Sequence, residues 1–434
     1  MSPEILGLLG FACIFALLAT GMPIGATLGL VGFAGMCLLY PLGGALIKMA
    51  TTPVDIISSY QFAVMPLFVL MAQVTFTCGF GADLFNLASK WLGHHRGGLA
   101  MASIAGSAGF GACSGSSLVT AATVNLVALP EMRRYGYDTK LAVGSIAAGG
   151  TIGSLIPPST MFIIYGILTG ASIGKLFAAS LIPALLTTVS YFITVYILCS
   201  INSKAGPRAP AALLTDKMGA LKNCWEILVL LVITIGGMIY GIFTPTDSGA
   251  IGAFGAILLG FFKKRLNWKS LLSAGMATMK TTGIMFTVLI GAMIFNFFCA
   301  KTRLPQMAAD WVVGLHISPW AVIGVIVVIY FFLGMVMEAP SIQILTIPVF
   351  YPIIVNALGF DPIWFGVVQV RMLEISLITP PLGMLAYIIA GTDKELNIGI
   401  VFRGAAPFLL MELITLPLFV FVTPITLWLP SLMK

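Results

Sequence analysis

The chain has 434 residues, of which 59% are hydrophobic and only 9% are charged. A soluble domain carries roughly 25% charged residues, so this composition excludes a water-soluble globule and places most of the surface against a lipid bilayer. The formal net charge of +7 does not indicate a nucleic-acid partner, because the basic residues fall in short loops between apolar runs, where membrane topology explains them.

Long apolar runs predict an all-α, polytopic membrane protein. Since a spanning helix needs about 20 apolar residues, a chain of this length has room for many spans and little other structure. The first run follows Met1 almost directly, without a basic leader, so we expect it to stay in the membrane. The runs cover 3–21, 24–42, 61–78, 99–129, 141–170, 174–200, 223–243, 247–262, 281–300, 319–356, 364–391 and 400–430.

Four of these runs are too long for one simple span. The runs 99–129 and 319–356 each contain small or polar residues near the middle, and we interpret them as re-entrant hairpins. The runs 141–170 and 364–391 are each interrupted by a Pro-Pro pair. Because proline removes an amide donor and clashes with the preceding turn, we expect both to be broken transmembrane helices.

The distribution of lysine and arginine supports the hairpins and gives an orientation. If both hairpins return to the side that they entered, sixteen basic residues face one compartment and five face the other, which makes the first side cytoplasmic. Threading either hairpin as a full span removes this bias. The sixteen are Lys90, Arg96, Arg133, Arg134, Lys140, Lys204, Arg208, Lys217, Lys222, Lys263, Lys264, Arg265, Lys269, Lys280, Lys394 and Arg403, and the five are Lys48, Lys175, Lys301, Arg303 and Lys434.

The two halves of the chain read as an inverted repeat. The stretch 153–158 (GSLIPP) matches 376–381 (SLITPP), and Ser117 and Ser341 each precede one of the matching prolines by the same interval. The hairpins enter from opposite faces in this threading, which is what an inverted repeat produces. The expected hairpin tips are Ser114-Gly115-Ser116-Ser117 and Glu338-Ala339-Pro340-Ser341.

Broken helices and hairpin tips in mid-membrane suit ion-coupled transport. Unwound carbonyls and Ser or Thr hydroxyls supply the oxygen ligands that a hard cation needs, and half-helix N-termini attract an anion. Bare carbonyls are tolerated in a membrane only where they line a cavity or are buried in protein. The alternative is that these features are helix kinks and packing seams, as in many helix bundles. The repeated order of hairpin, broken helix and span favours a site.

Four ionisable residues lie within apolar runs, where charges are costly and usually functional: Glu338, Arg371, Glu374 and Glu412. Arg371 and Glu374 are three residues apart on a helix and can pair, and such an internal ion pair favours a structural role over substrate binding. Glu338 at the second tip either holds the hairpin against its neighbours or tunes cation affinity. Enzyme activity is not expected, since the sequence has three histidines, no P-loop and no evident nucleophile–His–acid set.

Six stretches distributed over nearly the whole chain carry a family resemblance. They are FGACSGSS (110–117), PEMRR followed by GY (130–137), IGSLIPPS (152–159), GIFTPT (241–246), GMVME (334–338) and LITPPLG (377–383). Together they resemble the large membrane (M) subunit of tripartite ATP-independent periplasmic (TRAP) transporters. The resemblance implies an elevator-type, sodium-driven transporter of the bacterial inner membrane, distantly similar to the divalent-anion sodium symporters of the ion transporter superfamily.

The resemblance also implies partners and sites. The expected partners are a separate small four-helix membrane subunit, a periplasmic substrate-binding protein and a small organic anion. At least two sodium sites are implied, the first with Ser114, Gly153, Ile156 and Pro158 and the second with Gly334, Ser376, Thr379 and Leu382. The substrate candidates are Ser116, Ser117, Ser159, Ser341, Pro381 and Arg371. Two residues near the second site depart from the family pattern: Met372, where Asn is frequent, and Ser376, where Gly is common.

The expected division of the chain follows the repeat and the resemblance. Scaffold helices occupy 1–98, a first transport half 99–173, scaffold and arm helices 174–318, a second transport half 319–391 and a C-terminal span 392–434. A stand-alone divalent-anion/sodium symporter is the first alternative, and a channel or membrane scaffold is the second. The sequence does not distinguish a dicarboxylate, a sialic acid or a similar solute as the transported anion.

Overall fold

The computed structural model describes residues 2–335, 337–393 and 396–433, so Lys394 and Lys434 of the charge count, and residue 336 of the second predicted hairpin, lie outside the described residues. The described chain consists of α-helices with short 3₁₀ and π turns, which confirms the all-α class. Helices suit a lipid environment because they satisfy their backbone polar groups internally. Within the described ranges, seven helices are long and apolar enough to cross a membrane.

The helices follow one another along the chain with short connections. In order they are α1 (Pro3–Ala19), α2 (Ile24–Leu39), α3 (Leu42–Ser58), α4 (Val64–Thr77), α5 (Phe80–Leu92), α6 (Gly98–Ser114), α7 (Ser117–Arg134), α8 (Thr139–Ile152), α9 (Thr160–Thr169), α10 (Ile173–Ile201), α11 (Leu214–Leu231), α12 (Gly237–Ile239), α13 (Pro245–Phe262), α14 (Trp268–Thr302), α15 (Leu304–Gly314), α16 (Pro319–Gly334), α17 (Ala339–Tyr351), α18 (Pro362–Ser376), α19 (Met384–Gly391), α20 (Ile398–Phe421) and α21 (Pro424–Ser431).

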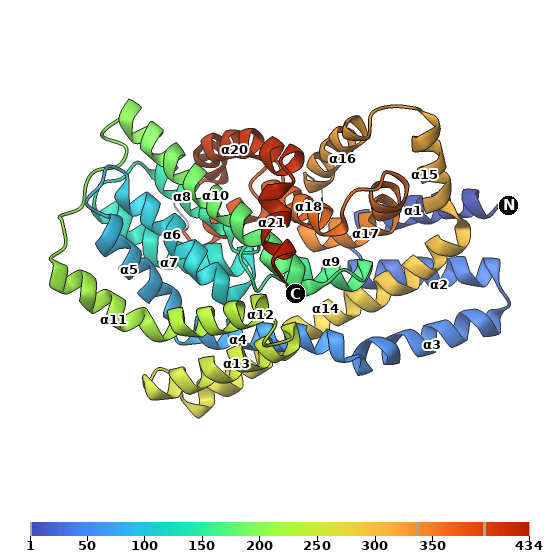
Figure 1. Ribbon diagram of the computed structural model, residues 1–434, viewed down its shortest axis with the longest axis horizontal. Coiled ribbons are helices and arrows are strands. Elements are labelled where there is room, and N and C mark those ends of the chain that lie inside the picture. The colour runs from blue at the N-terminus through green and yellow to red at the C-terminus, as the bar shows by residue number, and fades with distance from the viewer. Residues whose placement is uncertain (1, 336, 394–395, 434) are drawn as a thin grey trace.

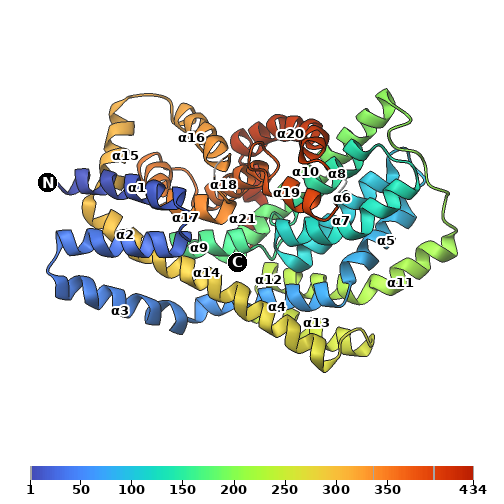
Figure 2. The same ribbon diagram turned by 180° about the vertical axis from the view of Figure 1, so that it is seen from behind.

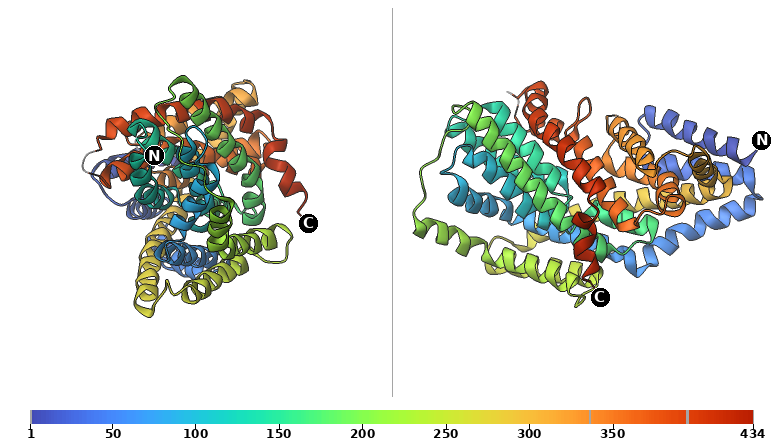
Figure 3. Two further views of the ribbon diagram at one scale, coloured as in Figure 1. Left: turned by 90° about the vertical axis from the view of Figure 1, so that its left-hand side faces the viewer. Right: turned by 45° about the horizontal axis from the view of Figure 1, so that its top comes forward.

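The molecule is elongated, with the N-terminus at one end (Figure 1). Helices α1, α2, α3 and α15 lie near that end and α5 to α8 lie near the other, as the view from behind also shows (Figure 2). Helices α9, α17, α18, α20 and α21 lie between the two ends, and the C-terminus lies near the middle of the long axis (Figures 1 and 3).

Glycines allow the closest helix contacts. Helix α2 packs along α14, and a Cβ added at Gly25 or Gly32 would lie within 2.9 Å of the α14 backbone. Helices α8 and α20 meet in the same way, since a Cβ at Gly144 would lie 2.1 Å from the carbonyl oxygen of Gly404. Small residues at such crossings let helix backbones approach where lipid offers no hydrophobic driving force.

The predicted hairpins and broken helices pack with matching partners in the two halves. Helices α6 and α7 pack on α8, as α16 and α17 pack on α18. Across the halves, α7 packs on α19 and α17 packs on α9. The second helix of each hairpin therefore contacts the broken helix of the other half. This reciprocal packing supports the inverted repeat read from the sequence, whereas the division into scaffold and transport regions stays a prediction.

Several helix boundaries differ from the predicted runs. Helices α3, α5 and α15 were not predicted, because charged residues such as Lys48 or Asp83 interrupt the apolar run of an amphipathic helix. Helices α11 and α14 begin well before the predicted runs 223–243 and 281–300 for the same reason. The run 400–430 is two helices, since α20 ends at Phe421 and Pro424 opens α21.

Candidate functional site

The first broken helix separates where the Pro-Pro pair predicts. Helix α8 ends at Ile152 and α9 begins at Thr160. Pro157 and Pro158, joined by a cis peptide bond, carry no amide hydrogen with which to continue the helical ladder. The hydroxyl of Ser159 accepts the amide of Phe162 at 3.4 Å and so caps the start of α9.

The second broken helix has the same construction. Helix α18 ends at Ser376 and α19 begins at Met384, and the Pro380–Pro381 bond is also cis. Gly383 stands at the N-cap of α19 with φ +35°, a left-handed conformation that glycine adopts without a steric penalty. The proline pair of the first break is buried, whereas that of the second is exposed.

Both breaks leave main-chain carbonyls without amide donors. Among the described residues, no main-chain amide donates to the carbonyl oxygens of Gly153, Ser154, Leu155, Ile156, Pro157 and Pro158 in the first break, or to those of Ile378, Thr379, Pro380 and Leu382 in the second. Within a membrane protein such oxygens are costly unless a polar partner or an ion satisfies them. The breaks thus provide two separate sets of candidate oxygen ligands.

The first hairpin tip docks on the first break. The carbonyl oxygen of Gly115, between α6 and α7, accepts the amide of Thr160 at 3.2 Å and its hydroxyl at 3.1 Å. A Cβ added at Gly115 would lie 2.1 Å from the carbonyl oxygen of Pro158, and one at Gly111 would lie 2.6 Å from the Cα of Gly153. Only glycine permits this approach of the two backbones.

The residues of the first predicted sodium site adjoin this contact. The hydroxyl of Ser114 lies 2.8 Å from that of Thr120, and a Cβ on Gly153 would lie 2.6 Å from the same Thr120 oxygen. In the described chain, the carbonyl oxygens of Ser114, Gly153, Ile156 and Pro158 accept no main-chain amide. All four predicted residues therefore offer a free oxygen, and sodium binding there stays a prediction.

The second predicted sodium site is less uniform. Gly334 is the last residue of α16 and packs closely on the end of α18, since a Cβ added at Gly334 would lie 2.0 Å from the Cβ of Ser376. The Thr379 hydroxyl donates to the carbonyl of Ile375 at 2.8 Å. The carbonyl of Ser376 accepts the amide of Thr379 at 3.2 Å, whereas those of Thr379 and Leu382 stay free of described amides. Helix α17 begins at Ala339, within the predicted second tip 338–341, because Pro340 is accommodated in the first turn of a helix.

The six substrate candidates occupy different settings. Ser117, Ser159 and Arg371 are buried, and the two serines are hydrogen-bonded within the protein. Ser116 is half-buried and Pro381 is exposed. The hydroxyl of Ser341 donates to the Glu338 carboxylate at 3.2 Å. A cavity of about 200 Å³ lies between the second tip, the start of α9 and the middle of α14, with walls that include Glu338, Pro340, Thr160, Met161 and Met285. Among the described contacts of the six candidates, the hydrogen bond from Ser341 to Glu338 is the one that leads to a residue of this cavity wall.

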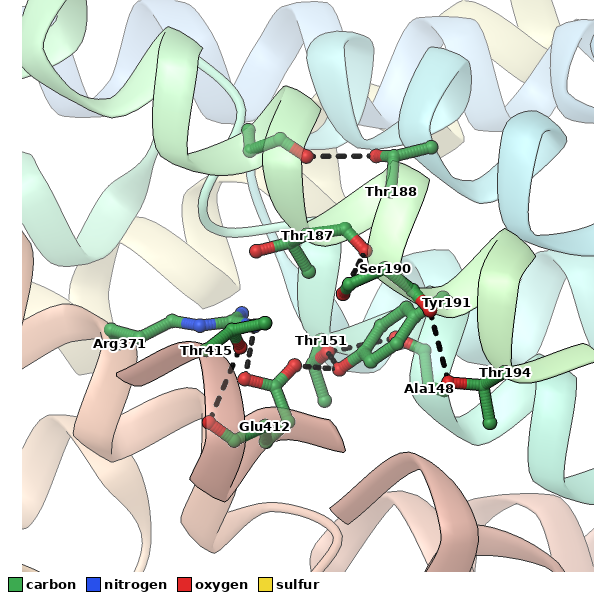
Figure 4. Close-up of polar contacts among 11 residues, drawn as sticks. Ala148, Thr151, Thr187, Thr188, Ser190, Tyr191, Thr194, Arg371, Glu412 and Thr415 are labelled. Atoms are coloured by element: carbon green, nitrogen blue, oxygen red, sulfur yellow. Dashed lines mark hydrogen bonds and ion pairs between the residues drawn. The ribbon is translucent and has the colours of Figure 1, made fainter. Parts of the chain in front are cut away.

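Arg371 does not pair with Glu374, so that prediction is wrong. Its guanidinium forms an ion pair with Glu412 of α20, and both side chains are buried. Glu412 also accepts the hydroxyl of Tyr191 from α10, and the Tyr191 oxygen lies 3.0 Å from the Thr151 hydroxyl near the end of α8 (Figure 4). The spacing along α18 suggested Glu374 as the partner of Arg371. The carboxylate that pairs with Arg371 is instead that of Glu412, on the neighbouring helix α20.

A comparison with protein families decides the identity. The model of the family described as "Tripartite ATP-independent periplasmic transporter, DctM component" matches residues 11–425, nearly the whole chain. The chain belongs to this family. It is a large permease subunit of a TRAP transporter and a multi-pass membrane protein.

Curated relatives agree with this assignment. The TRAP subunit is 33% identical to the C4-dicarboxylate TRAP transporter large permease protein DctM of Pseudomonas aeruginosa, over 86% of each chain. It is 31% identical to the sialic acid TRAP transporter large permease protein SiaM of Vibrio cholerae, over 96% of each. It is 33% identical to the 2,3-diketo-L-gulonate TRAP transporter large permease protein YiaN of Escherichia coli, again over 96% of each. These relatives are transporter permeases and not enzymes.

A solved structure supports the fold. The crystal structure of the Alcanivorax borkumensis YdaH transporter superposes with a TM-score of 0.60 over 96% of this TRAP subunit and 98% of that chain, at 16% sequence identity. At this identity the likeness concerns the arrangement of helices alone.

Sequence reasoning missed several residues that build the TRAP subunit's site. Ser154 and Thr120 hydrogen-bond the first tip, and Gln343 of α17 donates to the carbonyl of Met161 at 3.1 Å. The position of Ser154 inside the repeated GSLIPP stretch was an available signal. No pattern in the sequence indicated Gln343, since its partner is 182 residues away.

Proposed function

We propose that this TRAP subunit is the transport-bearing chain of a secondary-active, sodium-driven importer of a small organic acid anion in the bacterial inner membrane. A periplasmic substrate-binding protein delivers the solute, and a separate small four-helix membrane subunit completes the membrane part. The hairpins and broken helices move together as an elevator carrier against the remaining helices.

The observation that carries the sodium dependence is the pair of helix breaks with carbonyl oxygens that accept no described main-chain amide. A hard monovalent cation matches such oxygens, since carbonyls and hydroxyls replace its hydration shell. Among the described residues, no group of three or more His, Cys, Asp or Glu side chains that could hold a metal ion was found. Main-chain oxygens at the two breaks are the ligands that we propose for the coupling ion.

We infer the class of solute from the relatives. Those named above transport C4-dicarboxylates, sialic acid or 2,3-diketo-L-gulonate, which are all organic acids. The half-helices α9 and α19 begin beside the breaks. The backbone amides at a helix N-terminus favour binding of a carboxylate. The solute that protects the binding protein against thermal unfolding will identify the transported anion.

Reconstitution tests this function and separates it from its alternatives. We expect uptake into vesicles only when the large subunit, the small subunit, the loaded binding protein and an inward sodium gradient are all present. Uptake by the large subunit alone would favour a stand-alone divalent-anion/sodium symporter. Solute flux that ignores the sodium gradient, or that runs freely in both directions, would favour a channel.

A further inference from the structure

A buried carboxylate joins the two helix breaks. Glu374 of α18 is fully buried, and its Oε2 accepts the hydroxyl of Ser117 at 2.5 Å. Ser117 opens α7 at the first hairpin tip, 257 residues away in the sequence. The other carboxylate oxygen, Oε1, has no described hydrogen-bond partner. Arg371, the basic residue nearest along α18, is paired with Glu412 instead.

Ser117 extends this contact into the first break. Its hydroxyl lies 3.0 Å from the hydroxyl of Ser154 and accepts the Ser154 amide at 3.1 Å, while the Ser117 amide donates to the Ser154 hydroxyl at 3.0 Å. Ser154 lies within the first break, next to Gly153, whose carbonyl is free of described amides. The orientation of this carbonyl thus depends on the Ser117–Ser154 contact.

Glu374 also stands at the edge of the second break. It precedes Ser376 by two residues, and Ser376 contacts Gly334 at the end of α16. The contacts therefore run from the first break, through the first hairpin tip and Glu374, to the second break and the end of α16. Each step is a direct hydrogen bond, a side-chain contact or a short stretch of helix.

We propose that Glu374 is a positioning residue that couples the two sodium sites of the carrier, holding the first tip and first break in register with the second break through Ser117. The inference rests on the proposed function. An ion that orders the first break fixes Ser117 and so fixes Glu374 and the end of α18, where the second ion binds. Because such coupling is reciprocal, filling the second site strengthens the first by the same factor.

The test is equilibrium binding of radioactive sodium to the purified large and small subunits together. We expect the unmodified protein to bind sodium cooperatively, with a Hill coefficient above 1. Ser117→Ala keeps the carboxylate but removes the link, and Glu374→Leu keeps a side chain of similar size but removes the hydrogen-bond acceptor. Both should bring the Hill coefficient to about 1 and raise the half-saturating sodium concentration about 5- to 50-fold, within the usual range of coupling between sites.

A double variant and a matched control make the result specific. Ser117→Ala with Glu374→Leu should cost less than the two single effects combined, because each change alone already breaks the same contact. Ser103→Ala is the control, since Ser103 of α6 and Ser145 of α8 form a comparable buried hydrogen bond of 3.2 Å away from the tip. This control should bind sodium as the unmodified protein does. Ser154→Ala is a second way to remove the contact between the first tip and the first break, if Ser117→Ala does not fold.

The outcomes distinguish this inference from the proposed function. If the unmodified protein binds no sodium, the proposed function fails. If it binds sodium with a Hill coefficient of 1, or if Ser117→Ala and Ser154→Ala keep its cooperativity, the coupling role of Glu374 is wrong. A Glu374→Leu variant that binds sodium more weakly with unchanged cooperativity would show that the carboxylate does not couple the sites and would also overturn the proposal.

Discussion

At the residue scale, free oxygens and small side chains build the candidate sites. Ser114 lies at the first tip, beside the first break, and Thr379 lies in the second break. Each has a carbonyl oxygen that accepts no described main-chain amide and a hydroxyl that is hydrogen-bonded within the protein. Two buried ionisable side chains, Arg371 and Glu412, are instead paired with each other. We therefore expect ion binding and stability to depend on different residues, which variants can separate.

Removing a hydroxyl at either break should weaken sodium dependence more than expression. For Ser114→Ala and Thr379→Val we expect the sodium concentration for half-maximal uptake to rise about tenfold, the equivalent of one lost polar contact to a charged group. The measurement is uptake against sodium concentration, normalised to protein in the membrane. Unchanged sodium dependence in both variants would remove the assignment of these sites.

Breaking the buried ion pair should act on stability. Arg371→Ala leaves the Glu412 carboxylate unpaired inside the protein, which typically costs about 3–5 kcal/mol. Replacing both residues, as in Arg371→Met with Glu412→Leu, should restore much of that loss, since two apolar side chains need no partner. Thermal unfolding of the purified protein measures both. A double variant no more stable than Arg371→Ala contradicts the pairing.

At the element scale, the sequence predicted the helix breaks better than the contacts between them. Proline has a local effect, so the pairs at 157–158 and 380–381 located both breaks directly. The pairing of Arg371 could not be read in the same way, because its partner is 41 residues away and reaches it only through the packing of α18 on α20. Amphipathic α3 and α5 were missed because an apolar run is a poor signal for a helix with one polar face.

The contact between the first tip and the first break can be tested with a matched pair of glycines. Gly115 and Gly136 both have positive φ, +59° and +72°, but only a Cβ at Gly115 meets another atom, the Pro158 carbonyl oxygen at 2.1 Å. Both alanine variants carry the left-handed penalty of about 1–2 kcal/mol. We expect Gly115→Ala to lose uptake more than tenfold while Gly136→Ala keeps most of it. Equal uptake by the two variants would show that the tip does not need this close approach.

At the scale of the whole molecule, the two halves interlock. Each hairpin packs on the broken helix of its own half and reaches that of the other half, so the four elements have the contacts of a single carrier body. The cavity beside the second tip lies between this body and α14, which belongs to the predicted scaffold. If the proposed elevator motion carries this body past α14, a crosslink between the two should block it.

Cysteine crosslinking tests this motion. In a cysteine-free background, Met285→Cys on α14 and Pro340→Cys on α17 line one cavity, and a bifunctional thiol reagent joining them should abolish uptake until the link is cleaved. The control pair Phe62→Cys and Phe286→Cys lies within the predicted scaffold, where the two native rings are 6.5 Å apart, and its crosslink should leave uptake largely intact. Full uptake with the first pair crosslinked excludes an elevator movement at this surface.

The most direct measurement is a high-resolution experimental structure of the transporter complex in sodium and in choline. We predict ion density among the free carbonyl oxygens of both breaks in sodium, and its loss in choline. Finding these oxygens bonded to water or to protein in both salts, with no sodium-dependent density at either break, would contradict the account.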